Sequence, residues 1–231
     1  MIQTRAYHQA RFDVAVAEGA DRVFYVLVPD GLLADAVKWA EKTAGRTQST
    51  VVVVSGMDWN KDMSPWKADG VMKREKEFEG GAQMYLKELV SDYVPYIEQM
   101  YRLSIAKRYL IGVSLSGLFT MWTLGKTNVF SGLGSISGSL WFDGFTDWLA
   151  KVPAFPEVKV YISLGVKEKN TADRRMATVE DRTRETVALL ESRNVDVTFE
   201  MVSGTHFSPI LPKFDKAVDS LLAGAPAEEA A

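Results

Sequence analysis

The run STVVVVSG, residues 49–56, constrains the fold of this chain most strongly. It places four valines in succession, so a strand at this point carries apolar side chains on both of its faces. Strands of this kind are typical of parallel sheets, because helices cover both surfaces of such sheets. The run therefore predicts a central strand of a parallel sheet.

Apolar runs of strand length alternate with amphipathic runs of helix length along the rest of the 231 residues. The expected strands are 11–17, 22–31, 49–56, 107–113, 130–137, 158–165 and 195–204. The expected helices are 32–45, 82–102 with a kink or break at Pro95, 118–127, 175–194 and 210–224. This alternation predicts a single α/β domain over residues 1–224, with a mostly parallel sheet flanked by helices on both faces. A polar tail, 225–231, is expected to be disordered.

Composition excludes several classes of protein. The formal net charge is -3, so the chain lacks the basic surface of a nucleic-acid-binding protein. It has no cysteine, which excludes disulfides, thiolate zinc sites and a cysteine nucleophile. Charged residues interrupt the N-terminal segment, so it lacks the apolar core of a signal peptide. No apolar run approaches the roughly 18 residues of a membrane span. We expect a cytoplasmic protein that does not bind membranes, and the sequence indicates no particular oligomeric state.

The segment YLIGVSLSGLF offers a candidate nucleophile, Ser114, in a turn between an expected strand and an expected helix. A strand, a tight turn of small residues and a helix form the context in which a serine hydroxyl projects from the strand end. Leu115 N–H then lies at the helix N-terminus, where it can bind an oxyanion. Ser116 stands where the G-x-S-x-G pattern has its last glycine. The alternative is that Gly112 and Gly117 merely allow a tight corner.

A serine nucleophile needs a base, and the chain has only two histidines, His8 and His206. His206 follows the last expected strand and therefore lies at the same sheet edge as the serine, whereas His8 precedes the first clear strand. The third member is a carboxylate between serine and histidine that orients the imidazole. Glu168, just past the 158–165 strand, is favoured, with Asp173 and Asp143 as alternatives. Without the serine turn, His206 would be interpreted as an ordinary loop histidine.

The loop VPDGLL, which follows the 22–31 strand, is the expected source of a second oxyanion donor. The donor would be the backbone N–H of Gly31 or of Leu32. The alternative is a plain turn between a strand and a helix.

Aromatic residues gather in the loops at the same edge, and three of them are expected to line a substrate pocket: Trp59, Trp141 and Phe207. The alternative is that such rings pack the loops onto the sheet, and for Trp66 and Trp148 this interpretation is at least as strong. The 57–80 loop is the one candidate cover for the pocket, although its charged run at 73–79 is expected to be solvated.

Several motifs in order resemble the esterases of the α/β-hydrolase superfamily that are related to esterase D, siderophore (enterochelin) esterases and feruloyl esterases. The motifs are DWNKDMSPW, GGAQMYLKEL, GVSLSGLF, SGSLWF, SLGVKEKNT and GTHFSPILP, and the resemblance covers roughly residues 20–222. It implies an α/β-hydrolase fold and a carboxylesterase that acts on a small-molecule ester, with neither cofactor nor metal. Ser114 resembles the nucleophile, His206 the base and Glu168 the acid. The chain departs from its relatives at Thr205, where they often have histidine or asparagine.

Two other functions are compatible with the same residues. An acyltransferase would use the same acyl-enzyme but pass the acyl group to an alcohol or sugar. A non-catalytic binding protein would keep the fold without an assembled site.

Overall fold

One eight-stranded sheet forms the centre of the molecule in this computed structural model, which describes residues 1–71 and 77–223. The strand order is β1-β2-β4-β3-β7-β8-β9-β10. The strands are β1 (Ile2–Tyr7), β2 (Ala10–Ala15), β3 (Arg22–Leu27), β4 (Thr50–Ser55), β7 (Lys107–Val113), β8 (Gly132–Ile136), β9 (Lys159–Gly165) and β10 (Asp196–Val202). The six strands from β4 to β10 pair in parallel, while β1 and β2 are antiparallel. This confirms the mostly parallel sheet.

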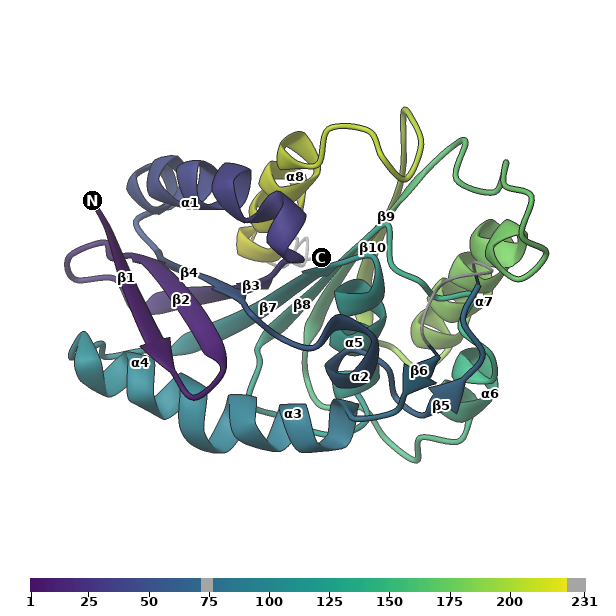
Figure 1. Ribbon diagram of the computed structural model, residues 1–231, viewed down its shortest axis with the longest axis horizontal. Coiled ribbons are helices and arrows are strands. Elements are labelled where there is room, and N and C mark those ends of the chain that lie inside the picture. Colours follow the sequence, from purple (N-terminus) through teal and green to yellow (C-terminus); the bar gives the residue numbers. More distant parts are fainter. Residues whose placement is uncertain (72–76, 224–231) are drawn as a thin grey trace, which may run out of the picture.

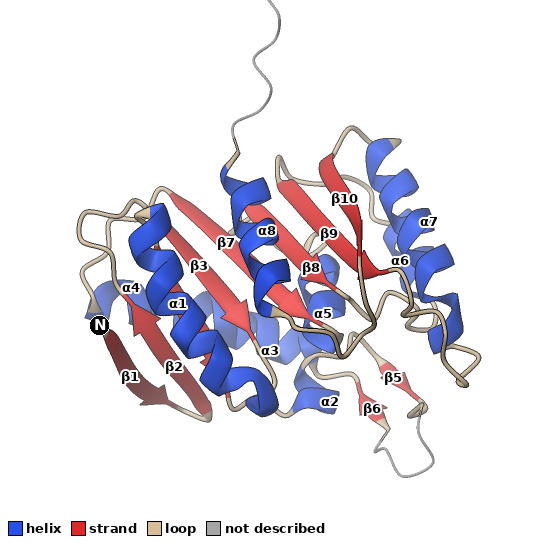
Figure 2. Ribbon diagram, turned by 90° about the horizontal axis from the view of Figure 1, so that it is seen from above, coloured by secondary structure: helices blue, strands red, loops and turns tan. Residues whose placement is uncertain are grey.

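Helices cover both faces of the sheet. Figures 1 and 2 show α1 (Leu33–Thr47) and α8 (Leu211–Leu222) side by side on one face. On the opposite face lie α3 (Ala82–Glu88), α4 (Val94–Met100), α5 (Leu115–Thr123), α6 (Phe145–Ala150) and α7 (Val179–Glu191). The sheet thus has a hydrophobic core on each side, as the fold class requires.

The four consecutive valines of β4 serve both cores. Val51 and Val53 pack with the residues of α1 and α8, whereas Val52 and Val54 pack in the core on the opposite face. All four are fully buried, because strand side chains alternate between the faces and both faces are covered. The prediction drawn from STVVVVSG is confirmed.

The parallel register brings the carboxyl ends of the central strands to one edge. Leu27 at the end of β3 pairs with Gly112 near the end of β7, and Val113 pairs with Ile136 at the end of β8. At the far side, Gly165 at the end of β9 pairs with Val202 at the end of β10. The loops that follow these strands therefore meet at one side of the sheet, where open α/β sheets place their sites.

The structure also differs from the expected elements. The sequence pattern missed β1, because its side chains are exposed or only half-buried and the apolar signal is weak. His8 lies in the turn between β1 and β2, not before the first strand. The expected loop at 57–70 contains a short helix, α2 (Trp59–Asp62), and the strand β5 (Lys67–Ala68), which pairs with β6 (Phe78–Glu79).

Helix boundaries also differ from the expected ones. α1 continues past Gly45 and ends at Thr47. The capping residue Gln48 takes the left-handed conformation and donates a side-chain hydrogen bond to the Gly45 carbonyl. The expected helix 82–102 is α3 and α4 joined by a π-helical segment, η2 (Leu89–Tyr93), with Pro95 in the first turn of α4. The helix after the serine turn begins at Leu115 rather than at residue 118.

Short 3-10 segments precede two helices, η1 (Asp30–Leu32) before α1 and η3 (Met176–Thr178) before α7. The expected disordered tail and residues 73–76 of the charged run lie outside the described residues. Within residues 1–71 and 77–223, no helix combines the length and the apolar character needed to cross a bilayer.

Candidate active site

Ser114 occupies the sharp turn between β7 and α5. Its backbone angles are φ 57° and ψ -121°, a strained conformation for a residue with a side chain. The surrounding backbone holds it in place: Ser114 N–H donates to the Ile136 carbonyl at 3.0 Å. The Ser114 carbonyl accepts from the N–H groups of Gly117, Leu118 and Ser139 at 3.0, 3.2 and 3.0 Å. These bonds project the hydroxyl away from the strand end.

The small residues around the turn have definite steric roles. A Cβ atom on Gly112 would lie 2.1 Å from the Ser116 carbonyl oxygen, so only glycine fits at this position. Ser116 is fully buried, and its Oγ accepts from Val113 N–H at 2.8 Å. The same Oγ lies 2.9 Å from the carbonyl oxygen of Leu27 on β3, to which it donates. Ser116 therefore bonds the serine turn to the neighbouring strand, a role that a glycine cannot fill.

The structure brings Ser114, His206 and Glu168 together at the carboxyl edge of the sheet. His206 Nε2 lies 3.0 Å from Ser114 Oγ, and His206 Nδ1 lies 2.9 Å from Glu168 Oε2. With the imidazole proton on Nδ1, that nitrogen donates to the carboxylate and Nε2 accepts from the serine hydroxyl. This order of groups is the one that a nucleophilic serine, its base and an orienting acid require.

The two alternative acids are engaged elsewhere. Asp173 Oδ1 accepts from the backbone N–H groups of Arg175 and Met176, both at 2.9 Å, and so caps the start of η3. Asp143 is exposed and forms an ion pair with Arg175, with 2.8 Å between Asp143 Oδ2 and the Arg175 guanidinium. Neither of these contacts involves His206, which leaves Glu168 as the carboxylate that contacts the imidazole.

Glu168 lies in a buried and fully hydrogen-bonded position. Its Oε1 accepts from Ser137 Oγ and from Gly165 N–H, both at 2.7 Å, while Oε2 faces His206. Burial alone would raise the pKa of Glu168, but hydrogen bonds from His206, Ser137 and Gly165 outweigh this effect and lower the pKa below its usual value. The carboxylate is thus held in its ionised form beside the imidazole.

The predicted oxyanion donors lie on two neighbouring elements. Leu115 is the first residue of α5, and the N–H groups of a first helical turn have no partner within the helix. In the η1 turn, Leu32 N–H donates to the Pro29 carbonyl at 2.9 Å. The Leu32 donor is therefore engaged, and Gly31 N–H remains the predicted second donor.

A cavity of about 700 Å³ opens at Ser114 and His206. Two of the three predicted pocket residues, Trp59 and Phe207, line it, and the Phe207 ring is 87% exposed. The remaining lining residues are Pro29, Leu32, Asp35, Val113, Ser208, Pro209, Ile210, Leu211 and Pro212. Most of these side chains are apolar, so the cavity presents an apolar wall beside the serine hydroxyl.

Trp141 does not line this cavity, contrary to its predicted place there. Its side chain is buried, with its ring near Phe78 and under the Arg175 guanidinium, whose Cζ lies 5.5 Å from the ring centroid. Trp66 and Trp148 do not line the cavity either. Their ring centroids lie 6.3 Å apart, and Trp148 belongs to α6 rather than to a loop. Trp66 Nε1 also donates to the Asp143 carbonyl at 3.0 Å.

The described part of the chain contains no group of three or more His, Asp or Glu side chains placed to hold a metal ion. The sequence has no cysteine. The expectation of a site without metal or cofactor remains a prediction.

Sequence reasoning missed two residues behind the acid, Ser137 and Lys213. Ser137 Oγ donates to Glu168 Oε1, and Lys213 Nζ lies 2.9 Å from Ser137 Oγ and 3.7 Å from Glu168 Oε1. A signal for Lys213 was present, because it shares one face of α8 with Ala217 and Leu221, both buried. A lysine in the apolar stripe of an amphipathic helix indicates a buried partner.

The sequence matches a known family over most of its length. The family model described as "Putative esterase" matches residues 10–212. Among curated proteins, the chain is 30% identical over 122 residues to the "Uncharacterized protein YbbA" of Bacillus subtilis (strain 168). That match covers 50% of this chain and 49% of the relative, so it spans about half of the relative's length.

Solved structures of hydrolases share the fold. The siderophore hydrolase EstA from Aspergillus nidulans is 19% identical with a TM-score of 0.71, over 95% of this chain and 92% of that one. An IroE-like serine hydrolase from Shewanella oneidensis is 18% identical with a TM-score of 0.74, over 96% of this chain and 79% of that one. At such identities the likeness establishes the α/β-hydrolase fold, as the sequence motifs implied. Because the family model spans residues 10–212, the chain belongs to this family of esterases, and the family and enzyme class expected from its motifs are confirmed.

Proposed function

We propose that the chain is a serine carboxylesterase that cleaves a small-molecule ester through an acyl-enzyme on Ser114. The supporting observation is the alignment of three side chains, with 3.0 Å between Ser114 Oγ and His206 Nε2 and 2.9 Å between His206 Nδ1 and Glu168 Oε2. A hydroxyl in such contact with an imidazole can transfer its proton as it attacks.

The acylation step follows from this geometry. Ser114 Oγ attacks the ester carbonyl carbon while its proton passes to His206 Nε2, and a tetrahedral oxyanion forms. Leu115 N–H and the donor near Gly31 bind the oxyanion, and Glu168 stabilises the imidazolium. The intermediate then expels the alcohol, which takes the proton from Nε2, and the acyl group stays on Ser114.

Deacylation uses the same groups with water in place of the alcohol. His206 Nε2 removes a proton from water, the resulting hydroxide attacks the acyl-enzyme carbonyl, and a second oxyanion forms in the same position. When it collapses, Ser114 Oγ leaves with the proton from Nε2 and the carboxylic acid is released. The serine and histidine return to their starting protonation states.

The cavity supports an uncharged ester as the substrate. Its lining combines prolines, aliphatic side chains, Trp59 and Phe207, and Asp35 is its one carboxylate. Among the described lining residues there is no lysine or arginine to pair with an anionic substrate. An apolar acyl or aryl group fits these walls, whereas a carboxylate near Asp35 would be repelled.

The replacement Ser114→Ala tests the proposal. We expect kcat for p-nitrophenyl butyrate to fall by at least about 10⁴-fold, because a serine nucleophile of this type accounts for most of the rate. A fluorophosphonate probe should add to the peptide that contains Ser114 in the wild type and to no peptide in the variant. The matched control, Ser192→Ala, removes an exposed hydroxyl at the end of α7 and should behave like the wild type. Wild-type rates in Ser114→Ala would disprove the proposal.

Substrate charge is tested with the wild type alone. A neutral p-nitrophenyl butyrate should give a higher kcat/KM than the p-nitrophenyl hemisuccinate of similar length. Equal values would contradict the uncharged-substrate class without touching the role of Ser114. Product analysis in the presence of methanol distinguishes hydrolysis from acyl transfer.

A further inference from the structure

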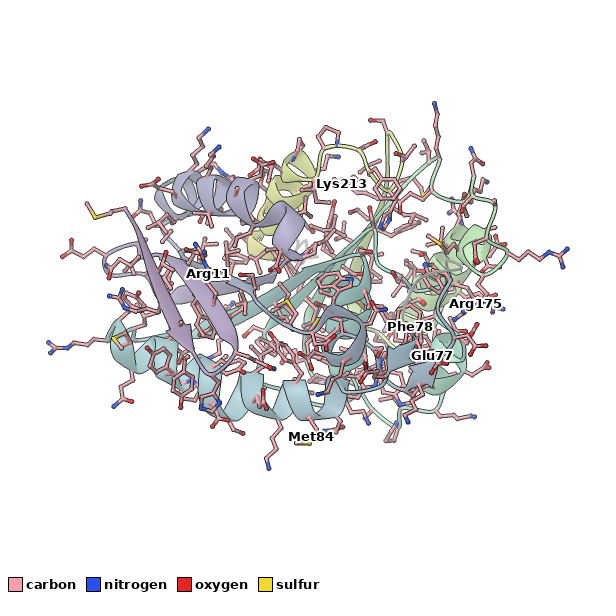
Figure 3. All side chains as sticks on the ribbon, in the orientation of Figure 1. Arg11, Glu77, Phe78, Met84, Arg175 and Lys213 are labelled. Carbon is pink, nitrogen blue, oxygen red and sulfur yellow. The ribbon has the colours of Figure 1, made fainter. Side chains whose placement is uncertain are left out.

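Lys213 is buried in a position that is unfavourable for a lysine. It lies in the first turn of α8 with a side chain only 5% exposed, and Figure 3 shows it at the end of the helix nearest the site loops. Burial penalises the ammonium form, and the positive end of the helix dipole disfavours a cation in the first turn. The position therefore requires a compensating partner.

The partners of Lys213 are Ser137 and Glu168, which begin a series of hydrogen bonds that ends at Ser114. Lys213 Nζ lies 2.9 Å from Ser137 Oγ, Ser137 Oγ lies 2.7 Å from Glu168 Oε1, and Glu168 Oε2 faces His206 Nδ1. An ammonium group has only donors, so Ser137 Oγ must accept from it and use its own proton toward Glu168. Oε1 is then occupied by donors, and Oε2 is left to accept from the imidazole.

The direction from donor to acceptor is thereby fixed in every hydrogen bond from Lys213 to Ser114. Since Glu168 Oε2 accepts, His206 Nδ1 carries the proton and Nε2 presents its lone pair to Ser114 Oγ. The backbone of Ser137 takes a strained conformation, with φ 49°. A hydrogen bond from Ser137 N–H to the Ser163 carbonyl, at 2.7 Å, helps to hold the residue in this conformation.

Titratable side chains from three elements meet at the Glu168 carboxylate. Glu168 comes from the loop after β9, His206 from the loop after β10 and Lys213 from α8, with the Ser137 hydroxyl after β8 between them. Burial lowers the pKa of Lys213, and the Glu168 carboxylate opposes that effect. Attraction between opposite charges is mutual, so the ammonium group at 3.7 Å also favours the ionised Glu168 carboxylate.

The geometry points to Lys213 as a positioning residue that, through the Ser137 hydroxyl, holds Glu168 ionised and oriented for His206. The inference rests on the proposed function for its kinetic consequence. Lys213 is absent from the lining of the cavity, so the role assigned to it acts through Glu168. Its loss should lower kcat and leave KM close to the wild-type value.

Lys213→Met tests this role, because it keeps the length and removes both the charge and the donor. We expect kcat for p-nitrophenyl butyrate to fall by about 10-fold to 100-fold. Losses of this size occur at metal sites when a residue that hydrogen-bonds to a metal ligand is removed. Protonation of Glu168 adds a loss of activity at the low-pH end of the acid limb of the kcat/KM profile. This loss should move to higher pH, because Glu168 without the ammonium keeps its proton to higher pH.

Lys213→Gln retains a donor without the charge. It should recover part of kcat, since the amide can still orient the Ser137 hydroxyl, but its acid limb should stay displaced. The matched control is Lys216→Met on the same helix, whose ammonium pairs with the exposed Glu200 at 2.9 Å. Its kcat and pH profile should match the wild type.

Titration of the Glu168 side-chain carbon by ¹³C NMR gives a readout independent of turnover. The midpoint should rise in both Lys213 variants and stay unchanged in Lys216→Met. If the wild type hydrolyses no ester but these shifts occur, the proposed function fails and the positioning role stands. If the wild type is active and folded Lys213→Met or Lys213→Gln keeps its kcat, its acid limb and the Glu168 midpoint, the inference is overturned.

Discussion

Two clusters in this molecule pair a glutamate with basic side chains, one inside the sheet edge and one on the surface. The side chains of Glu168 and Lys213 are 3% and 5% exposed. The Glu180 side chain on α7 is 17% exposed, and it pairs with Lys169 and Arg184, whose side chains are 52% and 53% exposed. Both carboxyls have a lowered pKa.

The causes of the two shifts differ, and the difference has consequences. At Glu168, burial raises the pKa and hydrogen bonds led by that of His206 must overcome it, so the ionised form depends on every partner. At Glu180, hydrogen bonds from Lys169 and then Arg184 lower the pKa against little opposition. What separates Glu168 from Glu180 is that burial is the largest single influence on the pKa of Glu168 and a minor one on that of Glu180.

The largest test of this comparison is kinetic. Glu168→Gln keeps the side-chain shape but offers an amide to His206 Nδ1–H, which favours the wrong tautomer. We expect kcat to fall by about 10²-fold to 10⁴-fold, as loss of the acid does in serine hydrolases of this type. Glu180→Gln should stay within about twofold of the wild type, because exposed pairs contribute little. Equal kcat values in the two variants, measured with p-nitrophenyl butyrate, would remove the distinction.

Stability should separate the same two positions. Glu168→Ala leaves the buried Lys213 ammonium without its carboxylate, which we expect to lower the free energy of unfolding by about 3–5 kcal/mol. Glu180→Ala removes two pairs with exposed cations and should cost about 0–1 kcal/mol for each pair. Urea unfolding followed by circular dichroism measures both. Similar losses in the two variants would mean that burial does not govern these pairs.

The pH dependence of stability gives the smallest and sharpest contrast. The folded pKa of Glu168 lies below its unfolded value of about 4.3, so its contribution is present above that value and is lost as pH falls through the folded pKa. Each unit of difference corresponds to about 1.36 kcal/mol. Glu168→Gln should therefore weaken the dependence of the free energy of unfolding on pH at acid pH, and it should do so even in 1 M salt.

Glu180 provides the control for that measurement. Glu180→Gln should flatten the curve at low ionic strength only, because salt screens its exposed partners. If 1 M salt abolished the Glu168 contribution as well, the carboxylate would behave as a surface group.

The sequence predicted the fold well where packing repeats a pattern. The four valines of β4 and the alternation of strands with helices determined the parallel sheet. It failed where the pattern is weak: β1 is a half-exposed edge strand, and β5 and β6 are too short to show a period. The π segment between α3 and α4 has no signal in the spacing of apolar residues.

The proximity of three residues of the candidate site could be predicted from the sequence, because all three follow strand ends. Ser114, His206 and Glu168 each come directly after a strand, and the parallel register brings those ends together. Ser137 and Lys213 were missed because hydroxyl and ammonium groups are usually exposed. Their role depends on which way a side chain points, and only the packed structure settles that. The side-chain direction of Trp141 was likewise not predictable from the sequence, and its ring packs near Phe78 rather than in the cavity.

Ser116 has a consequence for how sequences of this kind are classified. A search pattern that demands glycine two residues after the nucleophile would reject this chain. The turn itself demands a small volume at that position and tolerates a hydroxyl that finds acceptors, here the Leu27 and Val113 carbonyls. Relatives that carry serine at this point are therefore better recognised by the space and the partners available than by the letter in the motif.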